Sequence, residues 1–422
     1  MDSALPSYGQ AAALVAAYAA QPGRFRPGVE RIELAQAAGR ILTQPLLADR
    51  DQPPFARSTR DGYACRAAEA NTHAPLAIAG ASRAGDSPAG PLPPGAAWEI
   101  MAGAPIPTGT DAVIPFDRVK TAGAKTHNVG LLSRRNVKPG ENIVAQGAQA
   151  RAGEELLPAG TAIGFGEIAL AAACGYALLE VFRRPRVAIL STGDELVPVE
   201  SSPAPGQIRN SNSPMLAALV AATGGEPWLL PTAADNAQAL DEALALAATA
   251  DLLLISGGVS AGKFDLVEPA LARIGARFHF TGLRIQPGRP TVFGELPRGA
   301  GAGSRALPFF GLPGNPVASA VTFLLFAAPV LTALAGSRES RPRFVLARLS
   351  PPIERGGKAG LTRFLPAFCD FAATDGQPPQ VALVPWHGSG DLLALARSNC
   401  FVVVPEDARS LKPGSLATIL VS

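Results

Sequence analysis

The segment ISGGVSAGKFD carries the residue types of a loop that binds phosphate, with one mismatch. Gly257, Gly262 and Lys263 fit the spacing G-x-x-x-x-G-K, in which backbone N–H groups and the lysine hold phosphates. Phe264 stands where that loop needs a Ser or Thr hydroxyl for Mg²⁺, but Asp265 follows, and carboxylates are also oxygen ligands. We therefore interpret the segment as a glycine turn that cradles a ligand beside Asp265, with Lys263 either a phosphate contact or solvated.

Turns of small polar residues and glycines follow three strand-like runs, at 191–195, 256–260 and 311–316. In an open α/β sheet, ligands bind beyond the carboxyl ends of the strands. Glycines let a backbone approach a ligand, and the pair Asn315-Pro316 predicts a helix start whose N–H groups face an anion. Each turn alone is also an ordinary strand-to-helix connection, but three at one edge favour a phosphate-bearing ligand. The residues expected to bind it are Ser191, Thr192, Gly193, Ser256, Gly257, Gly258, Ser260, Gly311, Pro313, Gly314, Asn315 and Pro316.

Three acidic residues lie in the same region: Glu195 after the first strand, and Asp235 and Asp265 at expected helix starts. An Asp at a helix start commonly caps it, whereas carboxylates that converge on phosphates can hold Mg²⁺. Both interpretations stay open for Asp235 and Asp265. We expect Glu195, Asp235 and Asp265 to be the metal ligands if Mg²⁺ binds.

The loop RIQPGRP presents Arg289 from a turn that two prolines and a glycine stiffen. An arginine held in this way can bind an oxyanion through two parallel hydrogen bonds. The alternative is a surface arginine in an ordinary turn.

The turns need a scaffold of alternating elements to bring them together. Strand-like runs such as RVAILS and DLLLIS alternate with helical runs such as SPMLAALVAA, which predicts a mostly parallel sheet covered on both faces. Residues 7–43 and 151–175 are expected to be helical, whereas short apolar runs among Pro and Gly predict β structure elsewhere. The fold class is multidomain α/β and β, with a final barrel or sandwich. The expected domains are a helical N-terminal domain (1–52 plus 148–183), an inserted β domain (53–147), a central α/β domain (184–337) and a C-terminal β-barrel domain (338–422).

The composition excludes several classes of function for the 422 residues. A net charge of +3 with scattered basic residues gives no support to nucleic-acid binding. The N-terminus lacks the pattern of a signal peptide, and the apolar stretch 316–336 is better explained as a buried helix than as a membrane span. The four cysteines are far apart, which argues against zinc and disulfides and favours reduced thiols in the cytoplasm.

An ordered set of motifs identifies a family resemblance: STRDGYA, GAPIPTGTDAVIP, NVKPGENI, LSTGDEL, GQIRNSN, ISGGVSAGKFD, QPGRP and GLPGNPVAS. From about residue 8 to 418 the chain resembles the molybdopterin molybdenumtransferases, which include the bacterial MoeA proteins and the E domain of gephyrin. Its α/β domain alone also resembles the MogA-like molybdopterin adenylyltransferases and CinA-like proteins.

The resemblance implies a reaction and its site. The family inserts molybdate into adenylated molybdopterin with release of AMP, assisted by Mg²⁺. Asp61 of the DGYA motif is implied to act in the active site of the partner subunit, so a homodimer is expected, with Glu195, Asp235 and Asp265 as the other catalytic carboxylates. The family's PGxP loop matches at Pro287, Gly288 and Pro290, with Arg289 where Lys is frequent, and Ser389 matches a small residue of the HGSG stretch.

Several positions depart from the family pattern, and two other functions stay open. The departures are Arg60 for Met, Ala102 for Thr, Arg209 and Asn210 for Tyr and Asp, Gln286 for Lys, and an arginine at 363 rather than 366. One alternative is a nucleotide-pterin adenylyltransferase, which the extra β domains and Asp61 oppose. The other is a non-catalytic molybdopterin-binding scaffold, which Ala102 and Asn210 favour. Tungstate in place of molybdate is also open.

Overall fold

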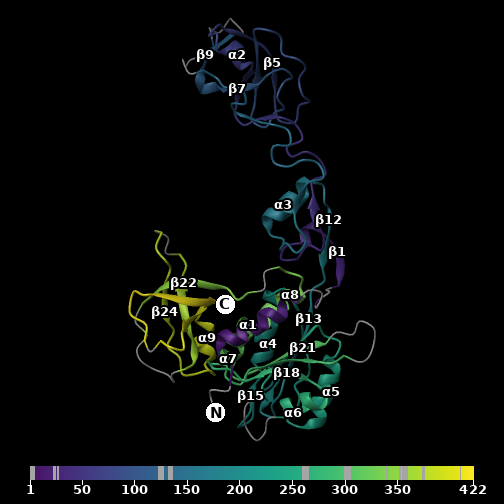
Figure 1. Cartoon of the computed structure of the whole chain (residues 1–422), viewed down its shortest axis with the longest axis vertical. Helices are drawn as coiled ribbons and strands as arrows, with labels where there is room; N and C mark the ends of the chain where they lie inside the picture. Colours follow the sequence, from purple (N-terminus) through teal and green to yellow (C-terminus); the bar gives the residue numbers. More distant parts are fainter. Residues whose placement is uncertain are drawn as a thin grey trace.

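The computed structural model lays the chain out along one long axis, with separate units at its two ends (Figure 1). A six-stranded β unit lies at one end, a small unit containing one helix lies in the middle, and an α/β unit and a barrel lie side by side at the other end. The structure describes residues 5–21, 25, 28–121, 128–131, 136–258, 266–298, 306–338, 341–350, 353, 360–372, 376–408 and 410–422.

The α/β unit is built on a six-stranded sheet whose first four strands are parallel, whereas the fifth strand pairs antiparallel with the strands on either side of it. This agrees with the predicted mostly parallel sheet. In order across the sheet the strands are β16 (Glu226–Leu229), β13 (Arg186–Ser191), β17 (Leu252–Ser256), β21 (Leu307–Leu312), β20 (Val292–Leu296) and β18 (Arg277–Thr281).

Helices cover both faces of this sheet, because successive strand residues point to opposite sides. Val187 and Ile189 pack into a cluster with α4, α1 and the helix that runs from Pro316 to Leu334, whereas Ala188 and Leu190 pack with α5 and α6. The helices are α1 (Tyr8–Ala19), α4 (Asn212–Ala222), α5 (Ala237–Ala247), α6 (Val267–Arg273), α7 (Pro316–Thr322) and α8 (Ala328–Leu334), with a π-helical turn (Phe323–Ala327) joining the last two.

The apolar stretch considered as a membrane span is the helix Pro316–Leu334. Among the described residues it is the one helix that is long and apolar enough to cross a membrane, with a mean hydropathy of 2.1. However, 72% of the apolar stretch of this helix is buried inside the protein, and Phe323 and Phe326 are fully buried against the sheet. The burial is that of a core helix.

The helix expected over residues 7–43 is wrong beyond Ala19. Residues Val29–Glu33 form strand β1, which pairs antiparallel with β12 (Leu178–Phe182). Helix α1 itself packs on α8 of the α/β unit, where the Tyr18 ring meets Phe293 edge-on at 4.9 Å between centroids. The first helix therefore contributes to the core of a different unit from the rest of the N-terminal segment.

The middle unit contains less helix than the sequence suggested. The second expected helix, 151–175, is helical only in α3 (Phe165–Ala173), and β11 (Glu155–Leu157) precedes it. Gly164 begins that helix, with the Glu167 side chain accepting a hydrogen bond from the Gly164 N–H at 2.9 Å. The other elements of the middle and connecting segments are a 3-10 turn (Leu34–Gln36), β2 (Leu46–Leu47), β3 (Arg57–Ser58) and β10 (Ile143–Val144).

The inserted unit is a six-stranded sheet, and the C-terminal unit is a closed barrel. In the barrel, β23 pairs with β24 through its last residues and with β25 through its first ones, so the sheet returns on itself. This closure decides between the two expected alternatives in favour of a barrel. The inserted sheet has the order β7 (Ala112–Pro115), β4 (Gly62–Cys65), β6 (Ala96–Ile100), β5 (Leu76–Ser82), β9 (Asn128–Leu131) and β8 (Val119–Thr121), with helix α2 (Ala67–Ala70) and a 3-10 turn (Phe116–Arg118) beside it. The barrel strands are β22 (Phe344–Leu349), β23 (Thr362–Asp370), β24 (Gln380–Leu383), β25 (Cys400–Val404) and β26 (Leu416–Val421), with helix α9 (Leu392–Ala396).

We expect Phe293→Ala to lower the free energy of unfolding of the α/β unit by about 3–5 kcal/mol, since it removes a fully buried ring. The Phe293 ring stacks on Phe310 at 4.5 Å between centroids, so the substitution leaves a cavity between the sheet and the helices on that face. Urea unfolding checks this. Phe165→Ala is the matched control, because that ring is 94% exposed. Equal midpoints for the two variants would contradict the packing.

Candidate functional site

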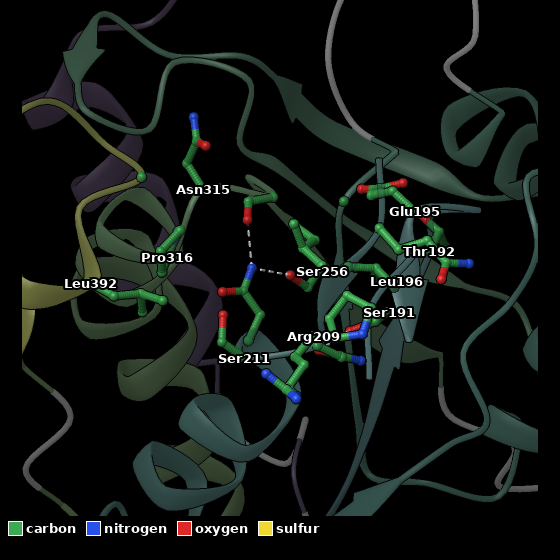
Figure 2. Close-up of a pocket in the computed structure, with 18 residues that line it drawn as sticks. Ser191, Thr192, Glu195, Leu196, Arg209, Ser211, Ser256, Asn315, Pro316 and Leu392 are labelled. Carbon is green, nitrogen blue, oxygen red and sulfur yellow. Dashed lines mark hydrogen bonds between the residues drawn. The ribbon is translucent and has the colours of Figure 1, made fainter. Parts of the chain in front are cut away.

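The three predicted turns lie together because their strands end level with one another. Ser191 is opposite Ser256 in the sheet, and Ser256 is opposite Leu312. The turns that follow therefore begin side by side at the carboxyl ends of the strands, where they line a cavity of about 540 Å³ (Figure 2). Its lining consists of Ser191, Thr192, Glu195, Leu196, Pro203, Gln207, Ile208, Arg209, Asn210, Ser211, Asn212, Ser256, Gly257, Gly314, Asn315, Pro316, Gly390 and Leu392.

Asn212, which the sequence analysis missed, ties the turns together. Its side-chain amide group donates hydrogen bonds to Ser256 Oγ at 2.8 Å and to the Gly314 carbonyl at 2.6 Å, as the dashed lines in Figure 2 show. Its own Oδ1 is buried without a partner, and so is Thr192 Oγ1. Both residues line the cavity and are over nine-tenths buried. Two oxygens that lack partners in a cavity wall are ready to bind a ligand or a cation.

Asn210, one of the departures from the family pattern, forms its side-chain hydrogen bonds with other residues of the protein. Its amide nitrogen donates to the hydroxyls of Ser213 at 3.0 Å and Thr232 at 3.4 Å. Its oxygen accepts from the Ser213 N–H at 3.1 Å and from the Ser191 hydroxyl at 3.5 Å. A carboxylate has no N–H to donate, so the amide suits this network. Asn210 therefore holds the start of α4 against the end of β13.

Glycine is required where the second turn passes the first. Gly257 and Gly258 have φ values of +93° and +63°. A Cβ on Gly257 would lie 2.7 Å from the Thr192 carbonyl oxygen, and one on Gly258 would lie 2.8 Å from Thr192 Oγ1. The close approach keeps the two turns in contact, whereas the role of these glycines in cradling a ligand stays a prediction.

The cavity has an apolar wall as well as polar ends. Leu196, Pro203, Ile208 and Leu392 line it, and Ile208 and Leu392 are about half exposed. Apolar surface with a few placed polar groups is the usual character of a site for a small molecule with rings. Glu195 lines the same cavity.

A second cavity, of about 440 Å³, adjoins the first between the α/β unit and the barrel. Asn315 lines both, and its amide nitrogen donates to Ser389 Oγ of the barrel unit at 2.9 Å. The predicted helix start is confirmed, with Asn315 at the N-cap position and Pro316 as the first helical residue, but the Asn315 side chain makes no capping bond. The predicted residues that line the second cavity are Pro287, Gly288, Arg289, Pro290, Pro313, Asn315 and Ser389, together with Ile285, Gln286, Ala318, Trp386 and Gly388.

Of the three predicted carboxylates that the structure describes, only Glu195 lies in the cavity wall. Asp61 lies in the inserted β unit, where its Oδ1 accepts the Ala102 N–H at 2.7 Å, and that unit is at the far end of the chain (Figure 1). Asp235 is exposed and outside the lining, and its neighbour Asn236, rather than Asp235, caps α5. Asp265 lies outside the described residues.

Four other predicted binding residues are also not part of the observed lining. Gly193, Gly258 and Gly311 lie in or beside the turns without lining either cavity. Ser260 lies outside the described residues. The described part of the chain contains no group of three or more His, Cys, Asp or Glu side chains that could hold a metal.

Three family models match the chain in succession. They are the MoeA N-terminal region (domains I and II) over residues 7–175, a probable molybdopterin binding domain over 188–333, and the MoeA C-terminal region (domain IV) over 347–421. Together they span all the units described above.

Curated proteins and solved structures agree with the family models. The chain is 36% identical to a molybdopterin molybdenumtransferase of Nostoc sp. over 93% of this chain and 88% of that protein. It is 32% identical to a protein of the same name from Haemophilus influenzae, over 94% of each. A crystal structure of the molybdopterin biosynthesis MoeA protein from Pyrococcus horikoshii OT3 superposes with a TM-score of 0.79 at 28% identity, over 99% of this chain and 100% of that chain.

We expect Asn212→Ala to lower the free energy of unfolding by about 1–3 kcal/mol, because it leaves Ser256 Oγ and the Gly314 carbonyl without a donor. Asn212→Asp is expected to cost at least as much, since a carboxylate cannot donate to these oxygens. Urea unfolding measures both, with the exposed Asn136→Ala as the control, for which a change within about 0.5 kcal/mol is expected. If Asn212→Ala unfolded at the same urea concentration as the wild type, the two hydrogen bonds of Asn212 would not stabilise the fold.

Proposed function

Because the chain belongs to the family of molybdopterin molybdenumtransferases, we propose that it inserts molybdate into adenylated molybdopterin and releases AMP. The observation that carries the proposal is the pair of adjoining cavities that share Asn315. A reaction between a large nucleotide-pterin and a small oxyanion needs two such sites in contact.

The first cavity suits the adenylated pterin. Its apolar wall, which includes Leu196 and Ile208, can pack against ring faces, while the buried Asn212 Oδ1 can accept a ring or ribose hydrogen. The register of the sheet and the hydrogen bonds of Asn212 to Ser256 and Gly314 hold these groups, so they are in position before the substrate arrives.

The second cavity suits molybdate. Arg289 is exposed on the rigid turn that lines it, and a guanidinium binds a tetrahedral oxyanion through paired N–H groups. Ser389 and Asn315, already bonded to each other, stand where the two cavities meet. Holding both reactants at this boundary replaces a collision in solution by a step within one complex.

A magnesium ion fits the oxygen donors of the first cavity. Mg²⁺ is commonly bound by one or two carboxylates together with substrate phosphates. The Glu195 carboxylate and the partnerless Thr192 Oγ1 line the cavity, and Asp265 is the second carboxylate we propose. When bound there, the ion would neutralise charge on the phosphoanhydride whose cleavage releases AMP.

We further propose that the protein acts in the cytoplasm as a homodimer in which Asp61 completes the site of the partner subunit. Asp61 is exposed at the far end of the chain from its own cavity (Figure 1), so a second copy is the simplest source of this carboxylate. The four cysteines are unpaired and buried, which suits a reducing compartment.

The test is AMP release from purified protein mixed with adenylated molybdopterin, Mg²⁺ and molybdate. We expect release that requires molybdate, stops with a chelator and returns with Mg²⁺. Glu195→Gln should lower it about 100-fold through loss of a metal ligand, whereas Glu226→Gln, exposed at the opposite edge of the sheet, should not. Adenylation of free molybdopterin by ATP would instead favour an adenylyltransferase, and tight binding without turnover would favour a scaffold.

Mixing two inactive variants tests the role of Asp61 across subunits. We expect Asp61→Asn and Glu195→Gln each to be inactive alone and, after unfolding and refolding together in equal amounts, to recover about a quarter of wild-type activity. The reason is that half the dimers are mixed, and one of the two sites in each is intact. No recovery, or a strict monomer by solution mass, would remove Asp61 from the partner's site.

A further inference from the structure

Charge is scarce in the wall of the first cavity. Among its described lining residues, Arg209 is the one cation and Glu195 the one carboxylate. The substrate proposed for this cavity carries a diphosphate, so its negative charge needs a positive partner from the protein.

A short parallel ribbon holds Arg209 at the rim. Strand β14 (Leu196–Val197) begins directly after Glu195, and β15 (Ile208–Arg209) pairs with it. The Ile208 N–H donates to the Glu195 carbonyl at 2.8 Å, which places the cation and the carboxylate on adjoining strands. Neither forms an ion pair with the other or with any other residue in the described part of the chain.

The guanidinium is oriented before any ligand binds. Its Nε donates to the Ser201 carbonyl at 2.9 Å, while the described residues offer its two terminal nitrogens no hydrogen-bond acceptor. Figure 2 shows this side chain reaching past Ser211 at the edge of the cavity. A guanidinium that is fixed at Nε, with its terminal N–H groups available, loses less side-chain entropy on binding an oxyanion than a mobile arginine does.

The adjacent helix start favours the same kind of ligand. Helix α4 begins at Asn212, and Ser211 and Asn212 both line the cavity beside Arg209. The Ser213 N–H is taken by Asn210 Oδ1 and Pro214 has no N–H, so the contribution of this helix start is its dipole, which favours negative charge. Arg209 and the start of α4 thus line the same cavity.

We propose that Arg209 binds the phosphate attached to the adenosine part of the substrate and is a specificity-determining residue of this chain. The proposal rests on the function proposed above. It assigns a nucleotide 5′-phosphate, rather than molybdate, to the rim formed by β14 and β15.

Titration calorimetry of the full-length protein with AMP and with adenosine tests the assignment. We expect Arg209→Gln to weaken AMP binding about tenfold and to leave adenosine binding unchanged, since only the charge-assisted hydrogen bonds are lost. Arg209→Lys should lie between wild type and Arg209→Gln, because it keeps the charge without the fork. Arg277→Gln, which changes net charge equally at a 76% exposed side chain on the opposite edge of the sheet, should bind AMP as wild type does.

The outcomes separate this proposal from the proposed function. Unchanged AMP affinity in Arg209→Gln, or an equal loss for adenosine, overturns the role of Arg209 even if wild-type protein releases AMP with molybdate. Selective loss of AMP affinity upholds it even if wild-type protein shows no turnover. Wild-type protein that binds neither AMP nor adenosine overturns it as well. In the turnover assay the substitution should raise KM and change kcat little, as for a contact made equally in the ground and transition states.

Discussion

The site depends on one constraint: the parallel strands β13, β17 and β21 end at the same level of the sheet. Since Ser191, Ser256 and Leu312 share a row of the sheet, the turns after them must start together at one edge. The core on both faces of the sheet enforces that row, because a slip of one residue would exchange the side chains that pack against the two layers of helices. Asn212 then joins the second and third turns to the start of α4, and Asn315 extends the connection to the barrel.

Much of the fold follows from local patterns in the sequence, and the failures have a common physical cause. The alternation of buried strands with Ala- and Leu-rich helices predicts the α/β unit because both periods are strong. Around Ile32 the apolar residues fit a helix face almost as well as a strand, and what decides is β12, about 150 residues away. Similarly, the choice between barrel and sandwich depends on β23 meeting β25, a pairing that no local pattern encodes.

The candidate site divides in the same way. Gly257 and Ser191 could be predicted because glycine and small polar residues after a strand have a local meaning. Asn212 could not, since its partner Gly314 is 102 residues further along the chain. For Asn315 a local rule predicted a helix cap, but a barrel serine 74 residues away takes the side chain instead. Residue type thus indicates which groups can act, whereas long-range contacts decide which ones face the cavity.

The barrel is joined to the α/β unit by more than side chains. Strand β19 (Ile285–Gln286), which leads into the Arg289 turn, pairs in parallel with the start of β23, so main-chain hydrogen bonds cross from one unit to the other. Because parting the units would break that pairing, it opposes a hinge motion that would widen the second cavity. Under the function proposed above, molybdate would then enter and leave a cavity whose two sides are joined by main-chain hydrogen bonds.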